Sequence, residues 1–181
     1  MTSVLLYVQL GLVVLTLLIG LIALGEIRLL SKSSRVSGPL REGSHAPIVT
    51  AIDLATQRPV DCPSQREGML IFLRLECPTC RSVASVGDQA LLSQLTFVCA
   101  GDIEACRGWV PVAAQGRTVV DQDGLLRQAY GIVKFPTAVL LRDGRIGTYG
   151  NPHDGDELRL FWESRPSASG NPLRVLEEEL G

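Results

Sequence analysis

Residues 70–80 read Leu-Ile-Phe-Leu-Arg-Leu-Glu-Cys-Pro-Thr-Cys, an apolar run that ends in two cysteines separated by two residues. The run from Met69 to Leu75 is short, apolar and introduced by a glycine, which is typical of a buried β-strand. After Cys80, apolar or small residues recur with a spacing that favours a helix: Val83, Ala84, Val86, Ala90 and Leu91. The stretch therefore predicts a Cys-x-x-Cys motif where a strand meets a helix, with both cysteines in the first helical turn.

Cysteines at such a junction are suited to thiol–disulfide exchange. The unpaired N–H groups at the start of a helix stabilise a thiolate, which is the reactive form of cysteine. Pro78 fits the first helical turn because it has no N–H group to leave unpaired. We therefore expect Cys77 to be the attacking thiol and Cys80, one turn later, to resolve the mixed disulfide.

Two other interpretations of the pair are open at this point. Cys99 and Cys106 are candidate partners for a four-cysteine zinc site, although their separation is wider than in a usual zinc knuckle. Cysteine is also commonly buried as an inert core residue. Redox chemistry at Cys77 and Cys80 is the interpretation that we favour, and it requires neither a metal nor an organic cofactor.

Strands and helices alternate over residues 42–165, which we expect to form one domain. Short apolar runs predict strands at residues 48–54, 95–99 and 118–120, and an Asp-Gly turn joins two more at residues 138–141 and 145–149. Helices are expected at residues 102–109, 125–130 and 156–163. This order predicts an α/β fold, a mixed sheet with flanking helices.

The N-terminal part of the chain predicts a membrane anchor. Residues 4–24 are 21 consecutive positions without a charge. A helix of that length reaches about 30 Å, the thickness of the hydrocarbon core of a bilayer. A cleaved signal peptide is the alternative, but no Lys or Arg precedes the run, which exceeds the usual length of about 7 to 15 residues. We expect a single transmembrane helix at residues 4–24, a linker at residues 25–41 and a polar tail at residues 166–181.

Charge and composition narrow the function classes. The net charge is −2 and no basic stripe is present, so nucleic-acid binding has no electrostatic basis. Five cysteines in 181 residues are too few for a disulfide scaffold. Their odd number leaves at least one thiol that is free or paired with another protein.

A second motif, further along the chain, helps to interpret the cysteine pair. Residues 130–140 read Tyr-Gly-Ile-Val-Lys-Phe-Pro-Thr-Ala-Val-Leu. Together with the Cys-Pro-Thr-Cys motif, this run resembles the thioredoxin superfamily, and the resemblance covers about residues 43–163. It implies a thioredoxin-like fold in which Pro136 is cis and faces the cysteine pair, and in which Phe135 offers backbone contacts to a bound partner strand. The other implied substrate contacts are Pro78, Thr79 and Thr137.

The N-terminal helix, the linker and the Cys-Pro-Thr-Cys site together resemble the MauD family of methylamine utilisation accessory proteins. That resemblance implies a bacterial protein with a periplasmic redox domain that helps to mature a disulfide-containing, methylamine dehydrogenase-like partner. An upstream membrane or periplasmic redox partner is implied as well. The flanking charges argue for the opposite orientation, because Arg28, Lys32 and Arg35 follow the apolar run. We give the resemblance more weight, since a bias from three basic residues can be overridden.

Two positions depart from the thioredoxin pattern. Ile71 stands where thioredoxins usually keep a buried acid that helps to deprotonate the resolving thiol. Glu76 directly precedes the pair, and its carboxylate disfavours a thiolate at Cys77. Glu76 is either a proton acceptor that replaces the missing acid or a simple solvated residue.

The other three cysteines have several candidate roles. Cys99 is expected at the same sheet edge as the active pair, so Cys99 and Cys106 are candidates for a second disulfide or an electron relay. We favour two ordinary small core residues. Cys62 is expected in a loop, as a free thiol or a surface partner to another chain.

The sequence therefore predicts a membrane-tethered thiol–disulfide oxidoreductase that acts on protein disulfides or thiols. The alternative is a non-catalytic thioredoxin-fold adaptor that docks a maturing partner protein. A peroxiredoxin-type peroxidase fits poorly, because Arg74 stands where a threonine would be expected three residues before the reactive cysteine.

Overall fold

The computed structural model describes residues 39–164, together with residue 15. Within this range a seven-stranded mixed sheet has the order β2-β1-β5-β4-β3-β6-β7. Strands β3, β4 and β5 are parallel neighbours, whereas β6 and β7 on one side and β1 and β2 on the other are antiparallel. The strands are β1 (Val49–Asp53), β2 (Pro59–Cys62), β3 (Gly68–Arg74), β4 (Leu95–Ala100), β5 (Thr118–Val120), β6 (Thr137–Arg142) and β7 (Arg145–Gly150).

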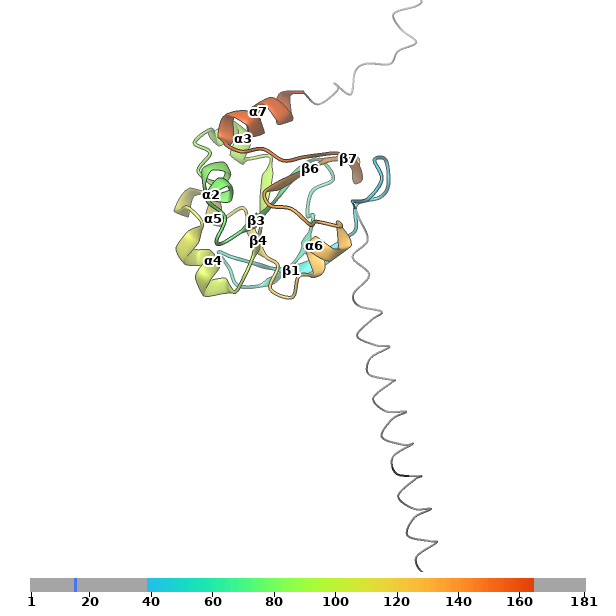
Figure 1. Cartoon of the computed structure of the whole chain (residues 1–181), viewed down its shortest axis with the longest axis vertical. Coiled ribbons are helices and arrows are strands. Elements are labelled where there is room, and N and C mark those ends of the chain that lie inside the picture. The colour runs from blue at the N-terminus through green and yellow to red at the C-terminus, as the bar shows by residue number, and fades with distance from the viewer. Residues whose placement is uncertain (1–14, 16–38, 165–181) are drawn as a thin grey trace, which may run out of the picture. The chain divides into compact units, whose positions relative to one another are not determined.

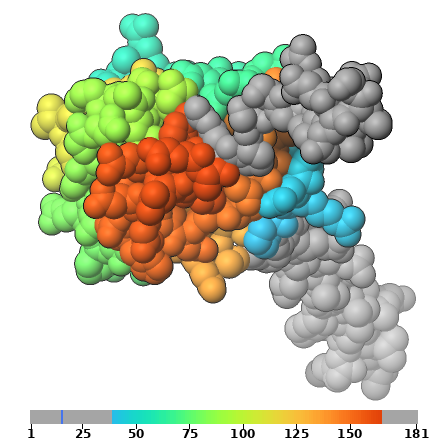
Figure 2. All heavy atoms as spheres, turned by 90° about the horizontal axis from the view of Figure 1, so that it is seen from above, coloured from blue at the N-terminus to red at the C-terminus, as the bar shows by residue number. Residues whose placement is uncertain are grey.

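The helices cover the two faces of the sheet unequally (Figure 1). They are α2 (Pro78–Ala84), α3 (Gln89–Leu92), α4 (Ile103–Trp109), α5 (Val112–Gln115), α6 (Leu125–Ala129) and α7 (Gly155–Glu163). Residues of α2, α3, α4, α5 and α7 belong to one hydrophobic cluster, and α6 contributes to the other. Figure 2 shows α7 beside the segment of α2 and α3, which it contacts.

Strand β3 lies inside the sheet, between β4 and β6, and divides the core. Met69, Ile71 and Leu73 pack into the cluster under α2 and α4, while Leu70 and Phe72 pack into the cluster under α6. Side chains alternate between the faces of a strand, and both faces here are covered. That is why this strand is apolar throughout and why the sequence shows it as a continuous run.

Most elements lie where the sequence predicts them, but two local predictions are wrong. The helix expected to continue through Leu91 is two short helices, because α2 ends at Ala84 and Asp88 starts α3. The Asp88 side chain accepts hydrogen bonds from the N–H groups of Ala90 and Leu91 and caps the second helix. Cys62 lies at the end of β2, not in a loop, and is buried.

Apart from residue 15, the predicted membrane span at residues 4–24 lies outside the described residues, as do most of the linker and the polar tail. Within residues 39–164, none of the helices combines the length and the apolar character needed to cross a membrane.

Candidate active site

The Cys-x-x-Cys motif lies where β3 meets α2, as the sequence predicts. Cys77 is the N-cap of α2, with extended backbone angles, and Pro78 is its first residue. A disulfide joins Cys77 to Cys80, with a Cα–Cα distance of 5.1 Å. The Sγ atom of Cys77 also accepts a hydrogen bond of 3.1 Å from the backbone N–H of Cys80. The outer sulfur therefore sits where a backbone donor stabilises negative charge.

The two sulfurs differ in access to solvent. Cys77 is half-buried, whereas Cys80 is 0% exposed and belongs to the core under α2. A partner molecule can reach Cys77 but not Cys80. This asymmetry assigns the first contact with a partner to Cys77.

The second motif contacts the first. The Phe135–Pro136 peptide bond is cis, which confirms the prediction for Pro136. The carbonyl oxygen of Phe135 lies 3.9 Å from the Sγ atom of Cys77. Residues separated by more than fifty positions thus form one site, with the outer sulfur beside the backbone of the cis-proline loop.

Asn151 holds the cis-proline loop, and no pattern in the sequence indicates this role. Its Nδ2 atom donates hydrogen bonds to the carbonyl of Pro136, at 2.8 Å, and to Oγ1 of Thr137, at 2.9 Å. Thr137 in turn donates to the carbonyl of Lys134 at 2.9 Å. These bonds fix the loop against the turn that follows β7.

Charged side chains surround the outer sulfur. The Arg74 guanidinium lies 5.8 Å from the ring centroid of Phe135, a cation–π contact at the end of β3. Glu76 is exposed and, with Arg81, lines a groove of about 600 Å³ beside Cys77. Opposite charges thus flank the place where a partner would approach.

The acid expected in thioredoxins is absent from the core of this domain. Ile71 is fully buried in its place. Among residues 39–164 the single buried carboxylate is that of Asp121, which accepts hydrogen bonds from the N–H groups of Leu126 and Arg127 and so caps α6. The Asp121 carboxylate is therefore engaged in capping α6.

Cys99 and Cys106 form a second disulfide, with a Cα–Cα distance of 6.3 Å. The expectation of two unpaired core residues was wrong, because α4 turns back over the end of β4 and brings Cys106 to Cys99. Both cysteines are 0% exposed. Since they are bonded to each other, their thiolates are not available to complete a zinc site with the first pair.

Cys62 is the free cysteine of the described residues. Of the two expected roles, the structure therefore bears out the free thiol, whereas a surface partner to another chain is wrong because Cys62 is 1% exposed. Burial, reinforced by the negative charge of Asp121, raises the pKa of the Cys62 thiol to about 12. The thiol is therefore neutral and unreactive in the folded protein at neutral pH.

The fold resembles that of solved bacterial thiol–disulfide oxidoreductases. A secreted Mycobacterium tuberculosis disulfide oxidoreductase, described as homologous to Escherichia coli DsbE, is 26% identical over 61% of this chain and 90% of its own, with a TM-score of 0.50. A putative thiol:disulfide interchange protein DsbE from Chlorobium tepidum is 19% identical over 68% and 95%, with a TM-score of 0.54. A thiol:disulfide interchange protein from Bacteroides sp. is 19% identical over 73% and 95%, with a TM-score of 0.52.

These similarities show that residues 39–164 have a thioredoxin-like mixed α/β fold. No protein-family model matches the chain, and no curated protein matches it.

Proposed function

We propose that the chain is a thiol–disulfide oxidoreductase that acts on protein disulfides or thiols through Cys77 and Cys80. The observation that carries the proposal is the pairing of a half-buried Cys77 with a fully buried Cys80, beside a cis-proline loop whose Phe135 carbonyl lies 3.9 Å from the outer sulfur. The similarity to solved thiol–disulfide oxidoreductases supports it.

In the reducing direction, the Cys77 thiolate attacks one sulfur of a partner disulfide. The partner's other sulfur leaves as a thiolate, and a mixed disulfide forms between the partner and Cys77. The Cys80 thiolate then attacks the Cys77 sulfur, which releases the second partner thiolate and restores the Cys77–Cys80 disulfide. Two electrons pass to the partner, and each thiolate released takes up a proton from water.

The oxidising direction is the reverse sequence. A partner thiolate attacks the Cys77 sulfur, and Cys80 is the leaving thiolate. The direction in the cell depends on the reduction potential of the pair relative to its partners, and about 30 mV changes the equilibrium tenfold. Neither direction needs a metal or an organic cofactor.

We further propose that residues 4–24 tether this domain to the membrane on its periplasmic side, where it serves the maturation of a disulfide-containing, methylamine dehydrogenase-like partner. The 21 uncharged residues and the resemblance to the MauD family support this proposal. The buried Cys99–Cys106 disulfide supports it as well, because structural disulfides persist in oxidising compartments. An upstream membrane or periplasmic redox protein would then recycle Cys77 and Cys80.

Turnover with a protein disulfide tests the enzymatic proposal. The full chain should catalyse exchange between dithiothreitol and a model protein disulfide, and the Cys77→Ser/Cys80→Ser variant should not. Equal cellular function of the double variant would instead establish the adaptor alternative.

Alkylation of Cys77 in whole cells tests the orientation. A membrane-impermeant maleimide should label Cys77 of the reduced protein in intact spheroplasts as fully as in lysed ones. Labelling that requires lysis would place the domain in the cytoplasm and overturn the periplasmic proposal.

A further inference from the structure

A groove of about 600 Å³ lies beside the outer sulfur, within the range of about 300 to 1,000 Å³ that binding pockets occupy. The β3–α2 junction, α2 and α4 form it together. Its apolar lining comes from Leu75, Pro78 and Trp109, and its charged lining from Glu76 and Arg81. Because Cys77 lines the same groove, a side chain next to a partner's reactive cysteine would enter it.

Trp109 is the largest side chain of this lining. It is the last residue of α4, half-buried, and it packs against the core cluster that contains Cys106. A half-buried tryptophan presents a large rigid apolar surface, and such residues dominate the binding energy of protein interfaces.

We propose that this groove binds a bulky apolar side chain next to the reactive cysteine of a partner polypeptide, that Trp109 makes the main contact, and that the Cys99–Cys106 disulfide holds Trp109 in place. The proposal rests on the oxidoreductase function proposed above and names the class of substrate it prefers.

The charges of the groove favour a polypeptide over a small acidic thiol. Glu76 directly precedes Cys77 and is exposed, so a carboxylate close to the attacking sulfur would be repelled. Glutathione carries two carboxylates, and Arg81 is the single cationic side chain of the groove. An extended segment with an uncharged apolar residue beside its cysteine avoids this repulsion and fills the apolar lining.

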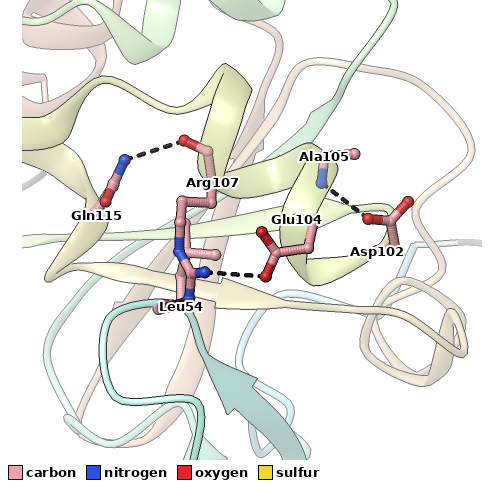
Figure 3. A network of polar contacts seen from close by, with 6 residues as sticks. All are labelled: Leu54, Asp102, Glu104, Ala105, Arg107 and Gln115. Atoms are coloured by element: carbon pink, nitrogen blue, oxygen red, sulfur yellow. Dashed lines mark hydrogen bonds and ion pairs between the residues drawn. The ribbon is translucent and has the colours of Figure 1, made fainter.

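Trp109 is carried by α4, and polar contacts along that helix hold it in place (Figure 3). Asp102 caps the helix at the N–H of Ala105, and Arg107 reaches the carbonyl of Leu54 at 3.4 Å. Gln115 donates to the carbonyl of Arg107 at 3.1 Å. A helix of seven residues is not stable by itself, so these hydrogen bonds determine where it lies.

The Cys99–Cys106 disulfide adds a covalent link, and Cys106 lies about one turn before Trp109. Cys106 and Trp109 are three positions apart and therefore lie on the same side of α4. Gly101 lies close to both the bridge and the groove. A Cβ atom added there would lie 2.7 Å from Cδ1 of Leu75 and 3.5 Å from Sγ of Cys106.

Peptide disulfides that differ at one position test the proposal. Two synthetic peptides carry a cysteine in a mixed disulfide with a chromogenic thiol, one with Leu and one with Ser beside the cysteine; glutathione disulfide is the third substrate. The reduced full chain should favour the Leu peptide about 10-fold in kcat/KM. Trp109→Ala should abolish that preference and change the rates with the Ser peptide and with glutathione disulfide less than about 2-fold.

Two variants sharpen this test. Val112→Ala, at a position that is 84% exposed on α5, is the matched control and should keep the full preference. Cys99→Ala/Cys106→Ala should lose the preference through a higher KM for the Leu peptide at unchanged kcat. Adding Trp109→Ala to this variant should cause no further loss of preference, because both changes remove the same contact with the Leu side chain.

A fluorescence readout serves where the bridge variant fails to fold. In the Trp162→Phe protein the remaining tryptophan is Trp109. A non-reactive peptide with Leu beside a Ser in place of its cysteine should shift its emission saturably, and the peptide without Leu should not.

The outcomes separate the two proposals. Equal losses for all substrates in Trp109→Ala, or an unchanged preference, would overturn the role of Trp109. A preference that survives loss of the bridge would overturn the positioning role of the disulfide. Failure of the wild-type chain to exchange with any of the three substrates would contradict the oxidoreductase function itself.

Discussion

The two disulfides of this domain lie at the ends of neighbouring parallel strands, yet they differ in their access to solvent. Cys77–Cys80 begins a helix after β3, and its outer sulfur is half-buried beside a backbone N–H. Cys99–Cys106 joins the end of β4 to α4, and both of its sulfurs are fully buried. The strands are in register, with Leu73 opposite Cys99. Access and the local donor, and not the position along the sheet, therefore distinguish a reactive pair from a structural one.

Among the variants that compare the two disulfides, removal of the Cys77 sulfur should lower the exchange rate most. Cys77→Ala should lower the exchange rate with a protein disulfide by roughly 10³-fold or more, because no other exposed thiol replaces the nucleophile. Cys99→Ala/Cys106→Ala should stay within about 10-fold of the wild type with the same substrate. Initial rates of dithiothreitol-driven turnover measure both. A similar loss in the two variants would show that the buried bridge takes part in the chemistry.

The two bridges should also differ in their rate of reduction. In the folded protein, dithiothreitol should open Cys77–Cys80 at least about 100-fold faster than Cys99–Cys106, because a thiolate must reach the sulfur that it attacks. Quenching with a maleimide and mass spectrometry of the peptides would report each bridge separately. In urea the difference should disappear. Equal rates without urea would mean that α4 opens readily.

Loss of the buried bridge should cost more stability than loss of the reactive one. From the sequence separations of seven and three, the chain-entropy relation gives about 2.4 kcal/mol for Cys99–Cys106 and about 1.6 kcal/mol for Cys77–Cys80. Alanine is the suitable replacement at the buried bridge, since a serine hydroxyl there would lack a partner. Urea unfolding of the two double-alanine variants measures the difference. The reverse order would contradict the structural role of Cys99–Cys106.

Cys62 is buried but not bonded to another cysteine, and its ionisation makes the free energy of unfolding depend on pH. Its pKa is about 12 in the folded protein and 9.0 as the reference for an exposed thiol, so above pH 9 the unfolded chain releases a proton that the folded chain keeps. Its contribution to stability is thus complete below pH 9 and declines as the pH rises towards 12. Between pH 9 and 10 the Cys62 thiol should lower the free energy of unfolding by about 1 kcal/mol, and Cys62→Ala should remove that part of the slope. A smaller part should remain, because burial also raises the pKa of Tyr130 and Tyr149. A slope unchanged in the variant would assign it to another group.

Asn151 should have the smallest effect. Asn151→Ala removes two hydrogen bonds to the cis-proline loop and should cost about 1 kcal/mol of stability and a few-fold in kcat/KM for a protein disulfide. Asn151→Asp is the matched variant, since it keeps the size but lacks the amide donor. Unchanged turnover in both variants would show that the loop is held without Asn151.

The sequence predicts the centre of this fold better than its periphery. The strand before Cys77 and the cis-proline run are local patterns, so they could be read directly. Residues around Cys62 could not, because two prolines flank a four-residue edge strand that pairs only with β1. The apolar spacing continues past Ala84 and predicted one helix, but Asp88 caps α3 and so separates it from α2.

The site was predictable to the extent that its parts are local motifs. Cys77, Cys80 and Pro136 belong to recognisable runs, and the structure brings these runs together. The Cys99–Cys106 bridge and the groove position of Trp109 arise from the way α4 packs onto β4. The sequence offered the bridge as one alternative, but it did not decide between a bridge and two ordinary core residues, and no pattern indicates the position of Trp109.

Covalent trapping in the native setting tests the central claim most directly. The Cys80→Ala full chain, expressed in its native cells, should accumulate a mixed disulfide with a partner polypeptide, and peptide mass spectrometry should place that bond at Cys77. Cys77→Ala/Cys80→Ala should trap nothing. A partner bound through Cys62, Cys99 or Cys106, or no trapped species under either oxidising or reducing conditions, would contradict the assignment of the exchange reaction to Cys77.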